Sequence, residues 1–450
     1  MNKKEIIEKD FQIELFSNKL FNITSFFLTS KQESILIDPI FEPELYTQLI
    51  TIKTTNLKYI FLTKKPFEYI SNYDELTQKY KIELIYKPKE NTLYNFGNVS
   101  IKSSNQGGFT EDSTNYILIN SDKKEKAVFT GGNILIGTIG NPYYKELNDI
   151  KKNQIKEKLY NDIQYLKSLD KNVYLFPSYI NSNGNCDTIE NEIKINEFFN
   201  LSKDDFYNKI SFQNYNPFYE QISIDNFPKD KSIENIYKSI KKLTVSEIEK
   251  YSTDENLFII DTRPLAKSNL GFIKNSIFFP IDISFTNWTL KLLYPKDNYI
   301  LIVEKSNEEE EIIKNFFRLG FPNIIGYFNY EDWVESGKNS EKLTIYPSTK
   351  ENIEKLVNDK KCVIDIREIN EYIESGIISH CFCIPFSTFK NKINDIPKND
   401  NIYITCRGGG RAAMAITYLI RKGFKNNFYN IEGGMMKVIN SGYSTVKYEK

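Results

Sequence analysis

The stretch Asn401-Ile-Tyr-Ile-Thr-Cys-Arg-Gly-Gly-Gly-Arg-Ala-Ala-Met-Ala-Ile-Thr-Tyr-Leu-Ile420 decides the fold of the C-terminal part of the chain. Residues 401–405 have the apolar pattern of a buried strand, and residues 412–420 have a good helix pattern. Three glycines between them, Gly408 to Gly410, predict a tight loop, because glycine adopts the backbone conformations that such turns need. The stretch therefore predicts a strand, a loop and a helix in succession, the repeating element of an α/β domain.

The loop has the composition of an anion-binding cradle. Backbone N–H groups of a glycine-rich turn point into one concavity, and the helix that follows adds the positive end of its dipole. Cys406 begins the loop, and two arginines add guanidinium groups. These groups would stabilise a thiolate, then a persulfide or a bound oxyanion, without a histidine base. We therefore predict that Cys406 is catalytic, and that its substrate-binding loop consists of Arg407, Gly408, Gly409, Gly410 and Arg411.

An internal repeat extends this pattern over the second half of the chain. The apolar run that ends in Asp261-Thr-Arg263 recurs as one that ends in Asp365-Ile-Arg367, 104 residues later. Gly320-Phe321 likewise returns as Gly423-Phe424, 103 residues later. A fixed spacing over so many positions predicts two copies of one domain. Because strands alternate with helices in each copy, we expect an α/β fold with parallel sheets.

The repeat divides the chain into three predicted domains. The first copy covers residues 243–345 and the second copy covers residues 346–450, and both names are used in this sense below. Residues 1–228 form a separate N-terminal domain, which ends at the charged linker Pro228-Lys-Asp-Lys-Ser232. A length of 450 residues also suits about three domains of roughly 150 residues.

Charge and hydropathy exclude several classes of partner. Lys+Arg and Asp+Glu each number 59, so the formal net charge is zero and no basic bias points to nucleic acid. No run of about 18 apolar residues occurs, so no membrane-spanning segment is predicted. We therefore expect a cytoplasmic protein without a nucleic-acid or membrane partner, and a homo-oligomer remains open.

The counts of cysteine and histidine narrow the chemistry. Five cysteines are too few and too oddly numbered for a disulfide framework, which suits a reducing compartment. A single histidine, His380, excludes a multi-histidine metal centre. The neighbouring Cys381 and Cys383 alternate on a predicted strand, and we interpret them as small buried core residues rather than metal ligands. Spacing alone names no resolving thiol for Cys406.

Cys406-x4-Arg411 after a strand, with Asp365-x-Arg367 upstream and Glu432-Gly-Gly434 downstream, resembles the rhodanese family of sulfurtransferases. The resemblance implies that Cys406 accepts a sulfane sulfur from thiosulfate or a low-molecular-weight persulfide, and passes it to a thiol or cyanide. It implies that Arg407 attracts the anionic donor. Arg411 acts either on the substrate or as a structural tie, with Asp365 as a candidate partner.

Some residues of the second copy depart from the family pattern. Ile377 stands where the family usually has His, Val438 where it often has Trp, and Ala412 where Ser or Thr often follows the loop. These changes leave the nucleophile in place. A related phosphatase family uses Cys-x5-Arg, and the shorter loop here favours a sulfur atom over a phosphoryl group.

The first copy lacks this chemistry. Where the nucleophile would stand, the sequence reads Ile302-Val-Glu-Lys305, without cysteine or loop glycines. Four glutamates follow, Glu308 to Glu311, and their charge would repel an anionic donor. We interpret the glutamates as a solvated start of a helix. The first copy therefore resembles a degenerate rhodanese domain that packs against its neighbour.

The N-terminal domain resembles the metallo-β-lactamase fold, an αββα sandwich, in the branch of glyoxalase II and the persulfide dioxygenases. That family has Thr-His-x-His-x-Asp-His after a buried strand, whereas this chain has Thr63-Lys-Lys-Pro-Phe-Glu-Tyr69. Lys64, Phe109, Gly132 and Tyr179 stand at positions of the family's metal ligands. We therefore predict no catalytic metal and no cofactor.

The order of the three domains resembles persulfide dioxygenase–rhodanese fusion proteins. In those proteins the first domain oxidises a persulfide and the last exchanges sulfur, but only the last domain keeps its nucleophile here. Two hypotheses follow. The chain is a sulfurtransferase that carries sulfur on Cys406, with a small sulfur donor and a thiol or cyanide acceptor. Alternatively, it is a non-catalytic persulfide carrier or scaffold that serves a sulfur-accepting protein.

Overall fold

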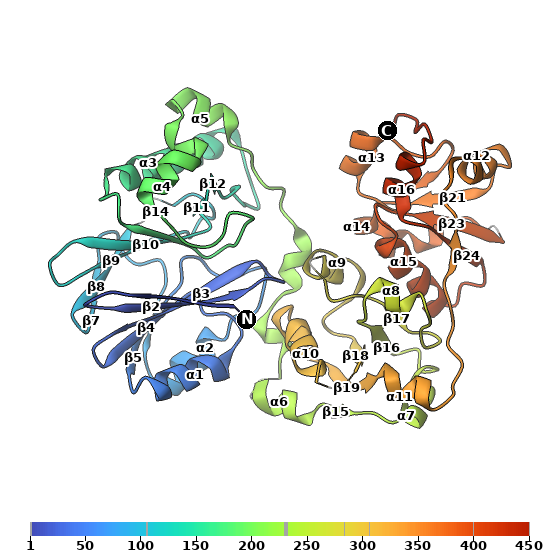
Figure 1. The fold of residues 1–450 in the computed structure, drawn as a ribbon, viewed down its shortest axis with the longest axis horizontal. Coiled ribbons are helices and arrows are strands. Elements are labelled where there is room, and N and C mark those ends of the chain that lie inside the picture. The colour runs from blue at the N-terminus through green and yellow to red at the C-terminus, as the bar shows by residue number, and fades with distance from the viewer. Residues whose placement is uncertain are drawn as a thin grey trace. The chain divides into compact units, whose positions relative to one another are not determined.

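The computed structural model describes residues 2–104, 107–228, 233–282, 284–305, 307–398 and 400–449. The chain divides into two units, residues 1–219 and 220–450 (Figure 1). The predicted linker at residues 228–232 lies almost entirely outside the described residues. The exact bounds of the three predicted domains therefore stay a prediction.

The first unit contains two six-stranded sheets. One sheet has its strands in sequence order: β1 (Asn2–Ile7), β2 (Gln12–Asn18), β3 (Ile23–Ser30), β4 (Glu33–Ile37), β5 (Asn56–Phe61) and β6 (Glu83–Ile85). The other runs in the order β14 (Asp187–Thr188), β13 (Tyr174–Pro177), β10 (Glu125–Gly131), β9 (Asn115–Ile119), β8 (Val99–Ser104) and β7 (Leu93–Phe96). A small hairpin adds β11 (Ile134–Leu135) and β12 (Thr138–Ile139).

Three apolar layers hold this unit together. Between the sheets, Phe26 lies 5.0 Å from Phe129 and 5.6 Å from Phe176, measured between ring centroids. The first sheet packs its outer face on α1 (Pro43–Ile52) and α2 (Tyr73–Tyr80). The second packs on α3 (Asp149–Ser168), α4 (Ile189–Ile195) and α5 (Lys203–Lys209). The arrangement is an αββα sandwich, as the sequence predicted (Figure 1).

The second unit contains two five-stranded sheets of the same topology. The sheet of the first copy also takes in the two residues before it, and its order is β15 (Lys241–Lys242), β19 (Ile324–Asn329), β18 (Asn298–Val303), β16 (Leu257–Asp261) and β17 (Ile277–Phe278). The sheet of the second copy begins two residues before that copy, and its order is β20 (Thr344–Tyr346), β24 (Asn427–Ile431), β23 (Asn401–Thr405), β21 (Cys362–Asp365) and β22 (Phe382–Cys383). The described strand pairs are parallel in both sheets, which confirms the predicted fold class.

Helices cover these sheets, and their apolar strands are buried accordingly. The first copy has α7 (Val245–Tyr251), α8 (Leu265–Ser268), α9 (Phe285–Leu292), α10 (Glu309–Arg318) and α11 (Tyr330–Glu335). The second copy has α12 (Lys350–Asn358), α13 (Ile369–Ser375), α14 (Phe386–Phe389), α15 (Gly410–Arg421) and α16 (Gly434–Asn440). A further helix, α6 (Ile233–Ser239), precedes both.

The two copies meet through the helix that follows the cysteine loop. The Phe278 N–H, on edge strand β17 of the first copy, donates to the Thr417 hydroxyl of α15 at 3.0 Å. Further along α15, Arg421 donates to the carbonyls of Ser252, Asp254 and Leu257. The first copy therefore holds α15 along much of its length, and α15 in turn fixes the end of the loop.

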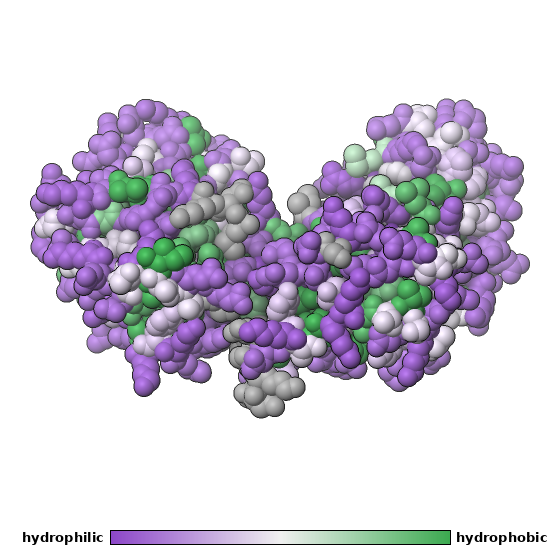
Figure 2. Space-filling view, turned by 60° about the horizontal axis from the view of Figure 1, so that its bottom comes forward, coloured by the Kyte–Doolittle hydropathy of each residue, from purple (hydrophilic) through white to green (hydrophobic). Residues whose placement is uncertain are grey.

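The surface has no large apolar region on the face that Figure 2 shows. Hydrophobic residues form small separate patches there among hydrophilic ones. Within the described ranges, no helix combines the length and apolar character that crossing a bilayer requires.

Candidate active site

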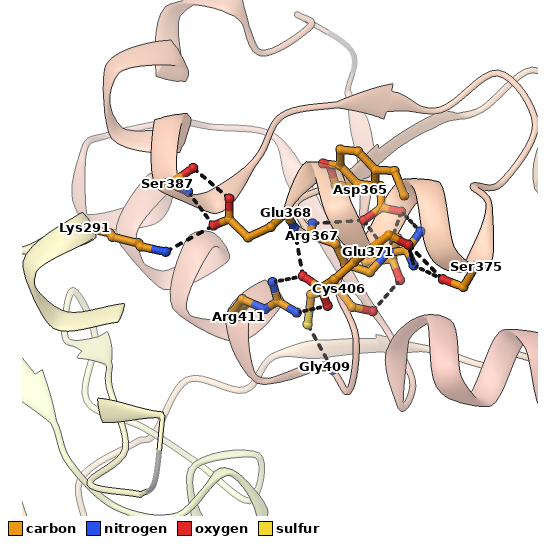
Figure 3. A network of polar contacts seen from close by, with 12 residues as sticks. Lys291, Asp365, Arg367, Glu368, Glu371, Ser375, Ser387, Cys406, Gly409 and Arg411 are labelled. Atoms are coloured by element: carbon orange, nitrogen blue, oxygen red, sulfur yellow. Dashed lines mark hydrogen bonds and ion pairs between the residues drawn. The ribbon is translucent and has the colours of Figure 1, made fainter. Parts of the chain in front are cut away.

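Cys406 is the first residue after strand β23, and the loop turns directly into helix α15 (Figure 3). Its side chain is buried, with the residue 1% exposed, and its sulfur accepts a hydrogen bond from the Gly409 N–H at 3.1 Å. Gly409 has φ of +93°, in the region that glycine adopts readily, and it forms the N-cap of α15. The sulfur therefore lies at the amide-lined start of a helix, where negative charge is favoured.

Neighbouring backbone groups hold the loop in place. Met435 N–H donates to the Cys406 carbonyl at 2.7 Å, and Met436 N–H donates to the Arg407 carbonyl at 3.0 Å. The Asn430 amide donates to the Gly409 carbonyl at 3.1 Å. Gly434 passes so close that a β-carbon there would collide with the Cys406 carbonyl. In the pair Gly433-Gly434, the missing side chain of Gly434 therefore lets the backbone lie close against the cysteine loop.

Arg411 forms a two-pronged ion pair with Glu371 of α13. The two N···O distances are 2.6 and 2.7 Å, and both side chains are largely buried. Burial acts to raise the pKa of Glu371, but hydrogen bonds from Arg411 and the Glu368 N–H outweigh it and lower that pKa. Burial acts to lower the pKa of Arg411, and Glu371 and the Cys406 sulfur reverse this effect. The suggested partner Asp365 was wrong: the tie is to Glu371.

Asp365 is already occupied by its own neighbour. Arg367 donates to both carboxylate oxygens at 2.7 to 3.1 Å, and the two side chains are 0% and 2% exposed. Arg367 also donates to the Gly376 carbonyl at 2.6 Å. Both oxygens of Asp365 are thus engaged by Arg367, and Arg411 pairs with Glu371 instead.

The outer part of the loop faces solvent. Arg407 and Gly408 are exposed, and a β-carbon at Gly408 or Gly410 would meet no atom within 4 Å. Arg407 borders a hollow of about 240 Å³. Arg367 and residues of α13 and α16 line the rest of it. The predicted loop residues are thus brought together around Cys406, with Arg407 on the accessible side and Arg411 on the buried side.

The first copy contributes two side chains to the surroundings of the loop. The Arg411 guanidinium lies 4.7 Å from the ring centroid of Trp288, on α9. Lys291 lies one turn further and reaches Glu368 at 3.4 Å (Figure 3). Burial lowers the pKa of Lys291, and Glu368 offsets part of that effect. Glu368 also accepts from the Ser387 N–H at 3.0 Å and hydroxyl at 2.7 Å, so it links Lys291 of the first copy to α14 of the second.

Sequence reasoning missed these supporting residues. Glu368 and Glu371 form a capping box at the start of α13, and their spacing of three before a helix is a signal that could have been noted. Their partners Arg411 and Lys291 lie tens of residues away, however, and no local spacing predicts those pairs. The first copy's role as a neighbour of the loop follows only from packing.

Cys381 and Cys383 differ from the prediction of buried core residues. Both are half-buried, and their sulfurs lie 3.8 Å apart in a hydrogen bond. The reason is that β22 is a two-residue strand at the edge of its sheet, so no further strand covers it. The alternation does place both sulfurs on one side, while Phe382 between them is 50% exposed. His380 is exposed.

The equivalent loop of the first copy carries a carboxylate in place of the thiol. Glu304 follows strand β18 and pairs with Lys267 at 3.0 Å and with Arg263 at 3.7 Å. In α10, Glu310 pairs with Lys314 and Glu311 with Arg318, at 2.6 and 2.7 Å. Two of the four glutamates, Glu310 and Glu311, are therefore paired along their own helix.

In the first unit, the positions of the family's metal ligands hold a different cluster. The Lys64 ammonium lies 3.3 Å from the Glu68 carboxylate and 4.1 Å from the centroid of the Phe67 ring. The Tyr179 hydroxyl donates to Glu68 as well. Burial and the Glu68 charge raise the pKa of Tyr179 well above its usual value, so this hydroxyl keeps its proton. Phe109 fills the space beside Gly132, where a β-carbon would collide with its ring.

These residues do not fit a zinc or iron ion. An ammonium group and a phenyl ring cannot donate electron pairs, and the carboxylate of Glu68 is engaged by Lys64 and Tyr179. In the part of the chain that the structure describes, no three His, Cys, Asp or Glu side chains are grouped to hold a metal. We derive no step through a metal in this domain.

Comparisons with known proteins agree with this architecture. A family model described as "Rhodanese-like domain" matches residues 349–441. A "Putative sulfur carrier protein YrkF" of Bacillus subtilis is 37% identical over 73 residues, which cover 16% of this chain and 38% of that protein. A "Sulfurtransferase" of Allochromatium vinosum is 30% identical over 87 residues, which cover 19% of this chain and 79% of that protein. The chain thus spans well under half of the Bacillus relative.

The fold of the larger part of the chain also has a solved counterpart. A crystal structure of a metallo-β-lactamase from Staphylococcus aureus superposes with a TM-score of 0.59 at 18% sequence identity. The match covers 72% of this chain and 99% of that one, and it shows the fold alone. A metallo-β-lactamase-like fold thus precedes the matched domain. Through the domain at residues 349–441, the chain belongs to the rhodanese-like family.

Proposed function

We propose that the protein is a rhodanese-type sulfurtransferase that carries sulfane sulfur as a persulfide on Cys406. The observation that carries the proposal is the Cys406 sulfur at the start of α15, with the Gly409 N–H directed at it from 3.1 Å. An amide donor at a helix N-terminus stabilises a thiolate and also the terminal sulfur of a persulfide. The name of the Allochromatium relative supports the same reaction class.

The reaction proceeds in two displacements. The Cys406 thiolate attacks the outer sulfur of thiosulfate, the S–S bond of thiosulfate breaks, and sulfite leaves with that electron pair. Cyanide or a thiolate then attacks the terminal sulfur of the Cys406 persulfide, and the Cys406 thiolate leaves. Both steps transfer a neutral sulfur atom between nucleophiles, so no metal or external oxidant is needed.

The loop residues divide the work between binding and positioning. Arg407 is exposed beside the 240 Å³ hollow and attracts the anionic donor. The backbone of Gly408, Gly409 and Gly410 forms the cradle, where two open glycine positions leave room for sulfur. Arg411 is held by Glu371 and acts as a positioning residue that keeps positive charge beside the sulfur. A reducing compartment such as the cytoplasm suits a chain with five free thiols.

The first unit supplies no second reaction in this proposal. The Lys64–Glu68–Tyr179 cluster satisfies its own charges, and it occupies the place where a persulfide-oxidising metal would be held. We propose that this domain is a pseudoenzyme in a sulfur-metabolising protein. A competition assay that offers both donors would show whether the protein prefers a persulfide to thiosulfate.

Thiocyanate formation from thiosulfate and cyanide tests the main proposal. The intact chain should show turnover. Cys406→Ser should lower the rate by a factor on the order of 1,000 or more, because no other group can replace the thiol that is removed. Cys186→Ser, which removes a thiol in the first unit, is the matched control and should keep full activity. Full activity in Cys406→Ser would refute the proposal.

A non-catalytic persulfide carrier is the second candidate, and one observation favours it. Cys406 is only 1% exposed, while Met436 and Ile439 beside the hollow are 53% and 38% exposed, as a surface for a protein acceptor would be. In that case mass spectrometry should find one added sulfur on Cys406 after incubation with a persulfide donor. Turnover with cyanide or small thiols should then be absent.

A further inference from the structure

Cys381 and Cys383 form a pair of thiols that the proposed reaction does not use. Their sulfurs are 3.8 Å apart, on one side of a two-residue edge strand. His380, just before the pair, has φ of +61°, and the Cys381 N–H closes a turn to the Ile378 carbonyl at 3.2 Å. Two thiols at this separation need to approach by only about 1.8 Å to reach the S–S bond length of ~2.05 Å.

The two thiols are chemically different. The hydrogen bond between the two sulfurs lowers the pKa of Cys383, whereas the same hydrogen bond, together with burial, raises the pKa of Cys381. Cys383 is thus the better thiolate, and Cys381 holds a proton next to it. This is the arrangement of an attacking and a resolving thiol.

The other cysteines outside the loop lack this arrangement. Cys362 is buried on the interior strand β21, and burial raises its pKa to about 11. Burial likewise raises the pKa of Cys186, in the first unit. Among the described residues, the sulfur–sulfur hydrogen bond of Cys381 and Cys383 is the one recorded contact between two thiols.

We propose that Cys381 and Cys383 form a second sulfur-reactive site, a dithiol that accepts sulfane sulfur from a low-molecular-weight persulfide and releases it as hydrogen sulfide. The Cys383 thiolate attacks the terminal sulfur of the persulfide, and the donor thiolate leaves with the electron pair of the broken S–S bond. Cys381 then attacks the inner sulfur of the Cys383 persulfide. A Cys381–Cys383 disulfide forms, and hydrosulfide leaves and takes up the proton that Cys381 loses.

Atoms and electrons balance in this sequence. The dithiol is oxidised by two electrons to the disulfide, and the sulfane sulfur is reduced by two electrons to sulfide. The site stays oxidised until an external dithiol reduces it, so one persulfide is consumed per chain and cycle. The inference does not depend on Cys406 as a sulfur carrier, and it is tested without that residue.

The experiment uses the full chain with Cys406→Ser, fully reduced and freed of reductant, and treats it with glutathione persulfide in the absence of air. We expect about one hydrogen sulfide per chain and a peptide that contains a Cys381–Cys383 disulfide. Adding Cys381→Ser should stop the reaction at a persulfide on Cys383 without sulfide release. Adding Cys383→Ser should abolish sulfide release, and adding Cys186→Ser should change nothing.

Two results would overturn the inference. One is that sulfide release persists after Cys383→Ser is added. The other is that the Cys406→Ser chain releases no sulfide and forms no Cys381–Cys383 disulfide. Peptide mapping on the chain with both cysteines intact avoids any dependence on how the double variants fold. If the intact chain forms no thiocyanate but the Cys406→Ser chain still releases sulfide, the Cys406 proposal is refuted and this inference stands.

Discussion

The two rhodanese-like copies share a buried Asp-x-Arg pair, but they differ in the side chain that begins the loop after the equivalent strand, which is Glu304 in one copy and Cys406 in the other. In both copies a buried Asp-x-Arg pair lies at the end of an interior strand, β16 or β21, and Arg263 and Arg367 each donate to the carbonyl of a later glycine, Gly271 or Gly376. At the end of the neighbouring strand in the sheet, β18 or β23, one copy presents the paired carboxylate of Glu304 and the other presents the thiol of Cys406.

The comparison shows that this fold can keep its buried Asp-x-Arg pair without having a nucleophilic cysteine. The Asp-x-Arg pair is retained where there is no nucleophile, so it stabilises the domain rather than the reaction. The glycine loop and the pair Glu371–Arg411 occur with Cys406 alone. The first copy has another role, because it holds α15 through Phe278 and Trp288.

Apart from the loss of Cys406 itself, the largest effect is expected from removing the carboxylate of Glu371, which pairs with Arg411 in the second copy. Glu371→Gln leaves the buried Arg411 without its counter-charge, and should cost about 1–3 kcal/mol of unfolding free energy, less than for a fully buried pair because the site is partly solvated. Sulfur transfer should fall by at least about tenfold, since Arg411 is no longer held beside the sulfur. Denaturant unfolding and thiocyanate formation measure the two effects. Glu374→Gln, on the same helix but exposed, is the control, and an equal loss there would contradict this role.

A smaller effect is expected from the backbone of the loop. Gly409 has φ of +93°, and an alanine would be strained there by about 1–2 kcal/mol, so Gly409→Ala should displace the N–H that faces the sulfur. Gly408→Ala has open space and no positive φ, so its loss of transfer should be clearly smaller. Relative rates of thiocyanate formation decide between them. Equal losses would show that space, not backbone conformation, governs the loop.

The contact between the copies gives a third, more modest test. Thr417→Val leaves the buried Phe278 N–H without its acceptor and should destabilise the second unit by about 1–2 kcal/mol. Thr417→Ser keeps the hydroxyl and should restore most of that stability. Thermal unfolding provides the readout. If Thr417→Val unfolds like the intact chain, the first copy does not support α15 through this bond.

The smallest effect is the acid dependence of the Glu371 pair. The pKa of Glu371 is lowered in the folded chain, so its stabilisation is complete above the ordinary glutamate pKa of about 4.3 and is lost as the pH falls through the lower folded value. Glu371→Gln removes this contribution, so the two proteins should converge in stability on acidification. Unfolding midpoints between about pH 3 and pH 6 measure it. A constant difference over that range would contradict the assignment.

Much of the fold could be predicted because its signals are local. Apolar runs and glycine positions are properties of short segments, and together with the 104-residue offset they predicted the parallel sheets, whereas the αββα sandwich was predicted from the resemblance to the metallo-β-lactamase fold. The suggested Arg411–Asp365 tie and the buried Cys381 and Cys383 were wrong. In each case the outcome depended on what else packs nearby: a nearer partner for Asp365, and a sheet edge at β22.

The sequence alone determined that a cysteine precedes three glycines at the start of a predicted helix, that the first copy has no cysteine at the equivalent position, and that Lys64, Phe109, Gly132 and Tyr179 stand in the N-terminal domain. These statements concern which amino acid stands at which position, and folding cannot change that. Only the tertiary structure decided which distant charges meet: Arg411 with Glu371, and Lys291 with Glu368. The packing of separate elements brings these partners within reach, so the energies of the pairs depend on distances and burial that no spacing along the chain encodes.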